Sequence, residues 1–446
     1  MARAEVAGAD LGDARLTKRL EIIADSLAKR PGESLPDVAG DEAALEAVYR
    51  FLGNAAVRPE AVLAPHVAQT CRRSEGRKRV LAVFDTTEVR FGGEREGLGY
   101  LTHEKGRGLL AHVGLAIDPD NREPLGVLHC ETVVRRGAMK RRKQARGAAD
   151  SESLRWHRGV EAVHTRLPDA ICVMDREADI FTLVAAMKSR NQHFVVRAAQ
   201  NRATPEGPLW DLLDDTELLT TRKVDLLERR PRKRKSERKA HPSRSAHTAT
   251  LEVRARRVTL RSSSEQLEIQ LVHVIERDPP EGDEPVEWIL LTSLPIRTKR
   301  DVDFIVDAYR ARWVIEEFFK ALKSGCAIEK RQLESVRTVT NALAVSLPIA
   351  WLLLRLRHLS RDQPDRPATT LISPLMLTCL RVLIMERTRK HLPARPTCKQ
   401  LTWAIAALGG HIKNNGEPGL IVLGRGLAKL LAAADVAVAL KRALKM

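Results

Sequence analysis

The sequence predicts an α/β protein whose core carries an inserted β subdomain and is flanked by helical regions at both ends. Three observations support this: two short buried strands each run into an aspartate, alternating β-type segments follow, and both ends of the chain have helical periodicity. The predicted boundaries are a helical N-terminal domain at 1–70, a core at 71–370 with the inserted β subdomain at about 198–287, and a helical C-terminal domain at 371–446.

The charge of the chain indicates a polyanionic partner. Seventy-five Lys and Arg oppose fifty-seven Asp and Glu, which gives a net charge of +18. Nucleic acid and an anionic membrane surface both fit that excess. Purely electrostatic binders share it, so the charge predicts a partner and no activity.

Other features favour a soluble cytoplasmic protein without a membrane segment. The longest apolar run, 342–354, is too short to span a bilayer and contains Pro348, so it predicts a buried helix. The N-terminus lacks the apolar block of a signal peptide. Six scattered cysteines without a CxxC motif favour free thiols and argue against a zinc site.

The N-terminal region shows helical periodicity from residue 10 to about residue 70. In its first helix, Leu16, Leu20, Ile23 and Leu27 form an apolar face. Arg15 and Arg19 make the outer side basic, as in a helix that lies on DNA. A solvated surface helix explains these arginines equally well at this stage.

Two buried strands, "VLAVFD" and "AICVMD", each end in a carboxylate, Asp85 and Asp175. An unpaired carboxylate at the edge of a core is costly, so it needs a compensating partner. One such aspartate is explained by capping of the following turn. Two of them, together with an acidic residue on a later helix, suggest a shared site.

The segment "YRARWVIEEFFKALKSG", residues 309–325, supplies that acidic residue. On a single helix a polar stripe runs along one face, separate from the apolar stripe. Its members are Tyr309, Arg312, Glu316, Lys320 and Lys323. Glu317 lies about 100° away from the stripe and is the poorer candidate. Taken alone, such a stripe is usually a solvated face.

Two strand aspartates and a helix glutamate form the carboxylate arrangement that binds two magnesium ions in ribonuclease H-like folds. Magnesium prefers oxygen ligands, and substrate phosphates complete its coordination. In such a site one ion activates the attacking water or 3′-hydroxyl, and the other stabilises the leaving oxygen.

These motifs together resemble the insertion-sequence-four family of DDE transposases, the group that includes the transposon-five enzyme. Residues 309–325 match the Y-R-E-K signature of the family, and "FDTTEV" and "MDREADI" match its two aspartate motifs. The likeness extends to "LGDARLTKRL", "AVYRFLGN" and "PVEWILLTS", so it covers most of the chain in order.

The resemblance implies a role for individual residues. Asp85, Asp175 and Glu316 become the metal-binding catalytic triad for two Mg²⁺ ions, for which Mn²⁺ is expected to substitute. The other stripe members, Tyr309, Arg312, Lys320 and Lys323, are expected to hold phosphates of the transposon end. Trp288 and Arg197 match family residues at a flipped nucleotide, although a tryptophan in a strand is more often part of the core.

The resemblance also implies a function. The expected activity is cut-and-paste transposition in a bacterial cytoplasm, with the enzyme associated with the nucleoid when it binds DNA. A homodimer would bind double-stranded DNA, both transposon ends and target, and cut through a hairpin intermediate. The C-terminal helices match the dimerisation region of the family, but aliphatic residues replace its usual tryptophans around "GLIVLGRGL".

Three alternatives remain open from the sequence. A ribonuclease H-like structure-specific nuclease explains the acids and the charge, but not the basic N-terminal helices. A catalytically silent DNA-binding regulator of transposition explains the charge, but not the three acids. If the chain is a purely electrostatic RNA binder, substitution of Glu316 by alanine is expected to change no activity.

Overall fold

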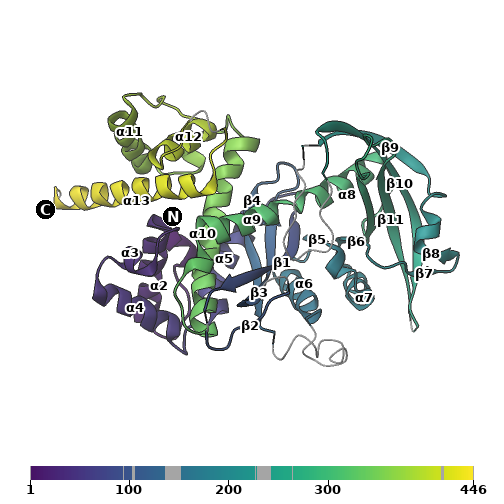
Figure 1. The fold of residues 1–446 in the computed structure, drawn as a ribbon, viewed down its shortest axis with the longest axis horizontal. Helices are drawn as coiled ribbons and strands as arrows, with labels where there is room; N and C mark the ends of the chain where they lie inside the picture. Colours follow the sequence, from purple (N-terminus) through teal and green to yellow (C-terminus); the bar gives the residue numbers. More distant parts are fainter. Residues whose placement is uncertain are drawn as a thin grey trace.

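The computed structural model describes residues 2–93, 95–102, 106–135, 152–226, 228, 243–263, 265–412 and 416–444. These residues form a mixed α/β fold around one large mixed sheet (Figure 1). The strand order is β2-β3-β1-β5-β6-β12-β11-β10-β9, with β4 paired to β3. The strands of the first half are β1 (Leu81–Phe91), β2 (Gly99–Tyr100), β3 (Arg107–Ile117), β4 (Pro124–Val133), β5 (Ile171–Met174) and β6 (Phe194–Arg197).

The first half of the sheet has the order β4-β3-β1-β5-β6. Strand β3 is antiparallel to both β1 and β4, whereas β5 is parallel to both β1 and β6. Much of these strands is apolar and buried, because helices cover both faces of the sheet. This mixed order is consistent with a ribonuclease H-like core.

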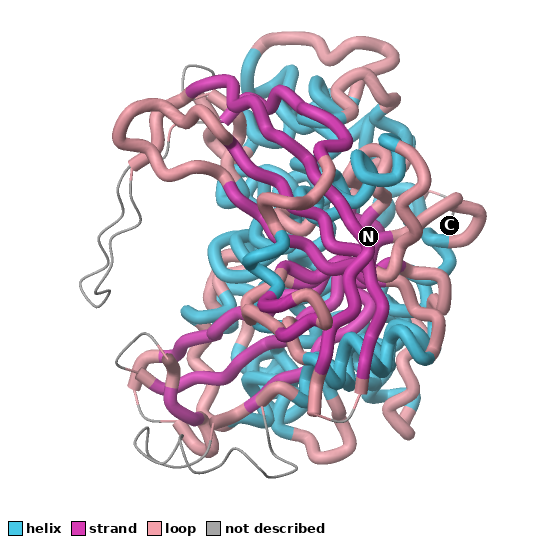
Figure 2. The backbone as a smooth tube through the Cα atoms, turned by 90° about the vertical axis from the view of Figure 1, so that its right-hand side faces the viewer, coloured by secondary structure: helices cyan, strands magenta, loops and turns pink. Residues whose placement is uncertain are grey.

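The second half of the sheet is antiparallel and continues from β6. Its strands are β9 (Leu218–Leu226), β10 (His247–Arg261), β11 (Gln266–Glu276) and β12 (Glu287–Thr292). A small hairpin, β7 (Ala203–Thr204) and β8 (Gly207–Pro208), precedes them. Because β12 pairs with β6, the described strands other than this hairpin form one continuous twisted sheet (Figure 2). The β strands expected here are present, while their assignment as an inserted subdomain stays a prediction.

Helices cover the sheet and form both ends of the chain. Helices α6 (Leu154–Arg166) and α7 (Phe181–Ser189) pack on one face of the core strands. Helices α5 (Pro59–Ser74), α8 (Lys299–Ala311), α9 (Val314–Lys320) and α10 (Val336–Asp362) pack on the other. The remaining helices are α1 (Ala2–Val6), α2 (Ala14–Lys29), α3 (Leu35–Ala39), α4 (Glu42–Gly53), α11 (Pro374–Thr388), α12 (Cys398–Leu408) and α13 (Leu420–Ala443).

Helix α10 runs through the centre of the molecule (Figure 1) and contains the longest apolar run. Among the described helices it alone is long and apolar enough to cross a membrane, but 89% of its most apolar window is buried inside the protein. The buried helix predicted at 342–354 is therefore confirmed, with Pro348 inside it. This helix is part of the core and is not a clear membrane span.

The two ends of the chain pack together beside α10. The predicted apolar face of α2 is confirmed, since Leu20, Ile23 and Leu27 are buried. Lys29 at the end of α2 forms ion pairs with Asp25 and with Asp435 of α13. The predicted domain boundary at residue 70 lies inside α5.

Two expectations about local structure were wrong. Asp85 does not end its strand, because β1 continues to Phe91 through antiparallel pairing with β3. Residues 309–325 do not form one helix either. Hydrogen bonds from residue i to i−3 interrupt it at Arg312 and Trp313, and its last part, Ala321–Gly325, is a π-helical turn. Two segments of the sequence that are rich in Lys and Arg, 135–147 and 228–247, lie largely outside the described residues.

Candidate active site

The parallel pairing of β1 with β5 brings the two predicted aspartates to the same level. Val83 and Val173 are the last paired residues of this ladder. Asp85 and Asp175 each lie two residues further along, so both occur on the same face as these valines. That face is the one covered by α9 and α10. The register therefore places the two carboxylates next to each other, just beyond the end of the β1–β5 ladder.

Asp85 lies in a strongly charged environment although its side chain is only 14% exposed. Its Oδ2 accepts a hydrogen bond from Arg312 Nη1 at 2.7 Å, and its Oδ1 accepts one from the Thr86 backbone N–H at 2.7 Å. Burial raises the pKa of Asp85 to about 7; Arg312 opposes this rise, while the charges of Asp175 and Glu316 add to it. All three carboxylates thus lie close enough to interact electrostatically.

Asp175 and Glu316 differ in how they are held. Asp175 Oδ1 accepts a hydrogen bond at 2.9 Å from the backbone N–H of Glu177, so it caps the short turn after β5. Glu316 is half-buried on α9, and its carboxylate has no hydrogen bond or ion pair with any described residue. It is therefore free to accept a ligand.

The neighbouring Glu317 points elsewhere. It forms ion pairs with Arg357 and Arg361 of α10, at 3.7 and 3.5 Å. The two adjacent glutamates of α9 therefore have different partners, which agrees with the prediction that Glu317 is the poorer site candidate.

Arg312 and Tyr309 lie at the junction of α8 and α9. Burial by itself lowers the pKa of Arg312, but the charges of Asp85, Asp175 and other neighbouring groups raise it above its usual value. Tyr309 is only 7% exposed, and its ring packs against Trp288 of β12 with a centroid separation of 5.7 Å. Tyr309 and Trp288 thus form a packing pair beside the site, and their DNA contacts stay predictions.

The two predicted lysines differ in their surroundings. Lys320 is exposed at the end of α9, with its Nζ 5.8 Å from the centre of the Trp313 ring. Lys323 lies in the π-helical turn, where its Nζ donates to the Glu88 carbonyl at 2.5 Å and lies 3.6 Å from Glu329 Oε1. Glu88 lies three residues after Asp85 on β1, so Lys323 lies beside this strand, whereas Lys320 faces solvent.

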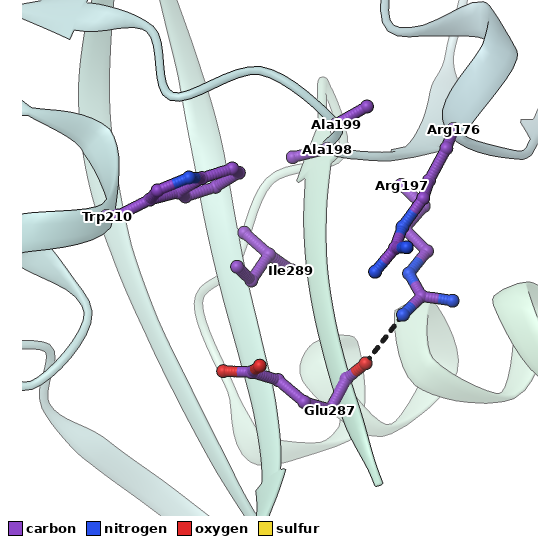
Figure 3. A pocket seen from close by; sticks show the side chains of 7 residues that line it. All are labelled: Arg176, Arg197, Ala198, Ala199, Trp210, Glu287 and Ile289. Atoms are coloured by element: carbon purple, nitrogen blue, oxygen red, sulfur yellow. Dashed lines mark hydrogen bonds between the residues drawn. The ribbon is translucent and has the colours of Figure 1, made fainter. Parts of the chain in front are cut away.

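Arg197, the last residue of β6, lines a cavity of about 370 Å³ (Figure 3). Its Nη2 donates to the Glu287 carbonyl at 2.8 Å. Arg176, directly after Asp175, and Trp210 line the same cavity, and the sequence analysis assigned neither of them a role. Trp288 is not among the residues that line this cavity, but it directly follows Glu287, whose carbonyl Arg197 contacts, and the role of both residues at DNA stays a prediction.

The N-terminal arginines lie on α2, which packs mainly on other helices, including α10 and α13. Arg15 is exposed and forms an ion pair with Asp13 at 3.0 Å. Arg19 is partly exposed on the same helix. Their role in DNA binding stays a prediction.

A network next to the aspartates was missed by the sequence analysis. Arg155, in the first turn of α6, donates from Nε to Thr86 Oγ1 at 3.0 Å and from Nη2 to Glu177 Oε2 at 2.5 Å. Thr86 Oγ1 also lies 3.0 Å from His112 Nδ1. These contacts join residues far apart in the sequence, so no local pattern could have revealed them.

The donor chemistry of the site fits magnesium, but the described side chains are not closed around an ion. Asp85, Asp175 and Glu316 offer only carboxylate oxygens, which hard divalent cations prefer. Burial is the main cause of the raised pKa of Asp85, and the charges of Asp175 and Glu316 add to it, so a bound cation would favour the ionised form of Asp85. In this conformation no three Asp, Glu, His or Cys side chains of the described residues converge on one point, and Arg312 pairs with Asp85.

Two family models match the chain. The one described as transposase DNA-binding matches residues 1–57, and the one described as transposase DDE domain matches residues 76–352. The first match covers the helices α1 to α4. The second covers more than half of the chain and includes β1, β5 and α9, which carry the three carboxylates.

Proposed function

The chain belongs to the transposase DDE domain family and is a DNA transposase, and we propose that Asp85, Asp175 and Glu316 form its metal-binding catalytic triad. The observation that carries this proposal is the register of β1 and β5, which puts both aspartates two residues beyond the end of one parallel ladder. The effect of Glu316 on the pKa of Asp85 adds the third carboxylate to the same site.

The side chains of the site have distinct roles in the proposed reaction. When bound, two Mg²⁺ ions, for which Mn²⁺ substitutes, supply activation of the attacking oxygen and stabilisation of the leaving oxygen. The triad holds them through its carboxylates. Arg312 pairs with Asp85 in the free protein, and its planar fork would suit two oxygens of a DNA phosphate if Asp85 were to hold a metal ion. Lys320 and Lys323 add point charges along the same backbone.

The proposed reaction is cut-and-paste transposition of the insertion-sequence-four type. Water nicks one strand at the transposon end, and the freed 3′-hydroxyl attacks the opposite strand to close a hairpin. The hairpin is then opened, and the 3′ end is joined to target DNA. Each step breaks one P–O ester bond and forms one P–O bond at the same phosphorus: the new oxygen comes from water in nicking and hairpin opening, and from a 3′-hydroxyl in hairpin closure and joining to target DNA. A single site can therefore perform all of them. In the host this takes place on chromosomal DNA in the cytoplasm.

The test uses purified protein and a plasmid that carries its gene with flanking DNA, with magnesium or with EDTA. The expected result is release of one discrete linear fragment in magnesium only, with hairpin ends detected by sequencing. Indiscriminate nicking contradicts the proposal and favours a ribonuclease H-like nuclease. Binding of paired transposon ends without any cutting contradicts it in favour of a DNA-binding regulator.

We also propose that the active form is a homodimer on paired ends, and α13 supports this. The second half of α13 extends away from the body of the protein (Figure 1). Val436 and Leu440, one turn apart on this helix, are 59% and 57% exposed. An apolar stripe on a projecting helix is suited to contact with a second protein.

A charge on this stripe is expected to weaken pairing. The double substitution Val436→Asp and Leu440→Asp should lower the amount of the complex of two protomers with two DNA ends at least about 10-fold, because burying an uncompensated carboxylate costs well over 1.4 kcal/mol. Analytical ultracentrifugation measures this. Ala439→Asp, an exposed neighbour, is the matched control. Unchanged pairing in the double variant would exclude this surface.

A further inference from the structure

Arg155 connects the two chain segments that carry the catalytic aspartates. On one side its Nε donates to the hydroxyl of Thr86, the residue after Asp85. On the other side its Nη2 donates to the carboxylate of Glu177, two residues after Asp175. Two nitrogens of one guanidinium thus hold β1 and the turn after β5 at the level of the site.

Both segments also hold their aspartates directly. The backbone N–H of Thr86 donates to Asp85 Oδ1 at 2.7 Å, and the backbone N–H of Glu177 donates to Asp175 Oδ1 at 2.9 Å. Each aspartate is therefore oriented by a residue whose side chain accepts a hydrogen bond from Arg155. A movement of either segment changes both the place and the direction of its carboxylate.

The guanidinium of Arg155 is itself firmly held. Its side chain is 7% exposed, and its Nη1 donates to the Glu152 carbonyl. Burial keeps the pKa of His112 well below its usual value, so its ring is neutral, and its Nδ1 lies 3.0 Å from Thr86 Oγ1. Because a guanidinium nitrogen can only donate, Thr86 Oγ1 accepts from Arg155 with either tautomer of His112.

We propose that Arg155 is a positioning residue that sets the separation of Asp85 and Asp175, so that both carboxylates can hold the metal ions. This inference rests on the proposed function of the triad. The parallel ladder ends at Val83 and Val173, so no backbone hydrogen bond of that ladder fixes the two strands at the aspartates. Arg155 takes over this task beyond the end of the ladder, at Thr86 and Glu177, where a misplacement of about 1 Å can cost about 100-fold in rate.

The test compares Arg155→Gln with Arg158→Gln. Arg158 lies one turn later on α6, but its side chain is 51% exposed and pairs with Glu131 of β4, away from the aspartates. Electron paramagnetic resonance of free Mn²⁺ measures metal binding to the complex with a transposon end. We expect the Mn²⁺ dissociation constant to rise about 10-fold in Arg155→Gln and to stay within about 2-fold of wild type in Arg158→Gln. The affinity for DNA should stay within about 2-fold of wild type in both variants.

Two further variants make the test specific. Arg155→Lys restores the charge but offers one nitrogen, so its Mn²⁺ affinity should stay near that of the Gln variant. Glu177→Ala removes the exposed acceptor without disturbing the core, and serves if Arg155→Gln fails to fold. It should weaken Mn²⁺ binding in the same direction. Where both fold, the double variant Arg155→Gln, Glu177→Ala should be no weaker than Arg155→Gln alone, since both remove one bridge.

The outcomes separate the two proposals. If wild-type protein shows no magnesium-dependent cleavage, both the proposed function and the proposed role of Arg155 are refuted. If wild-type protein cleaves and the folded variants bind Mn²⁺ as it does, only the role of Arg155 is overturned. The role of Arg155 is also overturned if Arg155→Lys recovers the full Mn²⁺ affinity, or if the losses of Mn²⁺ affinity add up in the double variant.

Discussion

Glu316→Gln is expected to abolish cleavage of transposon ends, lowering its rate at least about 10³-fold, while binding of the same DNA persists. The amide keeps the shape of the side chain but removes a charge needed only during the reaction, and losses of this size follow from such changes. Glu316 has no partner among the described residues, so its substitution should leave the fold intact. A cleavage assay with labelled end DNA and a gel-shift assay measure the two effects.

Glu317→Gln is the matched control, since it changes the next residue of α9 in the same way. Glu317 pairs with Arg357 and Arg361 of α10, so its substitution affects packing and not the site. We expect its cleavage rate to stay within about 3-fold of wild type, because partly exposed ion pairs contribute little. Equal loss in both variants would mean that Glu316 has no special place in the reaction.

Asp85→Asn is expected to abolish cleavage and, unusually, to stabilise the free protein at neutral pH. Burial, followed by repulsion from Asp175 and Glu316, raises the pKa of Asp85 from 3.8 to about 7 despite the opposing effect of Arg312. Its ionisation is therefore easier in the unfolded chain than in the folded one. The Asn side chain can still accept the hydrogen bond from Arg312 without this penalty.

The sign of the pH dependence follows from proton binding. Below pH 3.8, Asp85 is protonated in both states, so it carries no penalty. Between this value and about 7, the folded state keeps a proton that the unfolded state has lost, so the free energy of unfolding falls as pH rises. Above about 7 the penalty is constant. The difference in free energy of unfolding between Asp85→Asn and wild type should therefore be about 2 kcal/mol more favourable to the variant at pH 8 than at pH 5.5.

Urea unfolding of both proteins at pH 5.5 and pH 8, without divalent metal, measures this difference. Adding magnesium at pH 8 should stabilise wild type more than the Asn variant, because only the wild type offers the third carboxylate to the ions. A variant that is less stable than wild type at pH 8, or a difference that does not grow with pH, would contradict the raised pKa of Asp85.

Much of the fold could be predicted because its elements have strong local patterns. The apolar face of α2, the buried strands β1 and β5, and the alternating strands β10 and β11 were all recognised from their periodicity. The continuation of β1 past Asp85 could not be predicted, because it depends on pairing with β3. The break at Arg312 also has no local signal, since neither proline nor glycine occurs there.

The same division holds for the candidate site. Its carboxylates were found from the sequence because acids directly after buried strands, and one acid on a polar helix stripe, are local features. The partners of these carboxylates were not found. Arg312 reaches Asp85 across 227 positions, and Arg155 reaches Thr86 across 69. Trp288 packs against Tyr309, a contact without a local signal in the sequence, and its role at DNA stays a prediction.

The sequence by itself determined which residue types are available and on which elements they occur: helices at both ends, strands between them, and three carboxylates among many cations. The tertiary structure alone decided how these groups act on one another. The register of β1 and β5 aligns Asp85 with Asp175, and the packing of α9 adds Glu316, so burial and mutual repulsion raise the pKa of Asp85. The physical reason is range: periodicity is set by neighbours along the chain, whereas electrostatic and hydrogen-bond partners are set by distance in space.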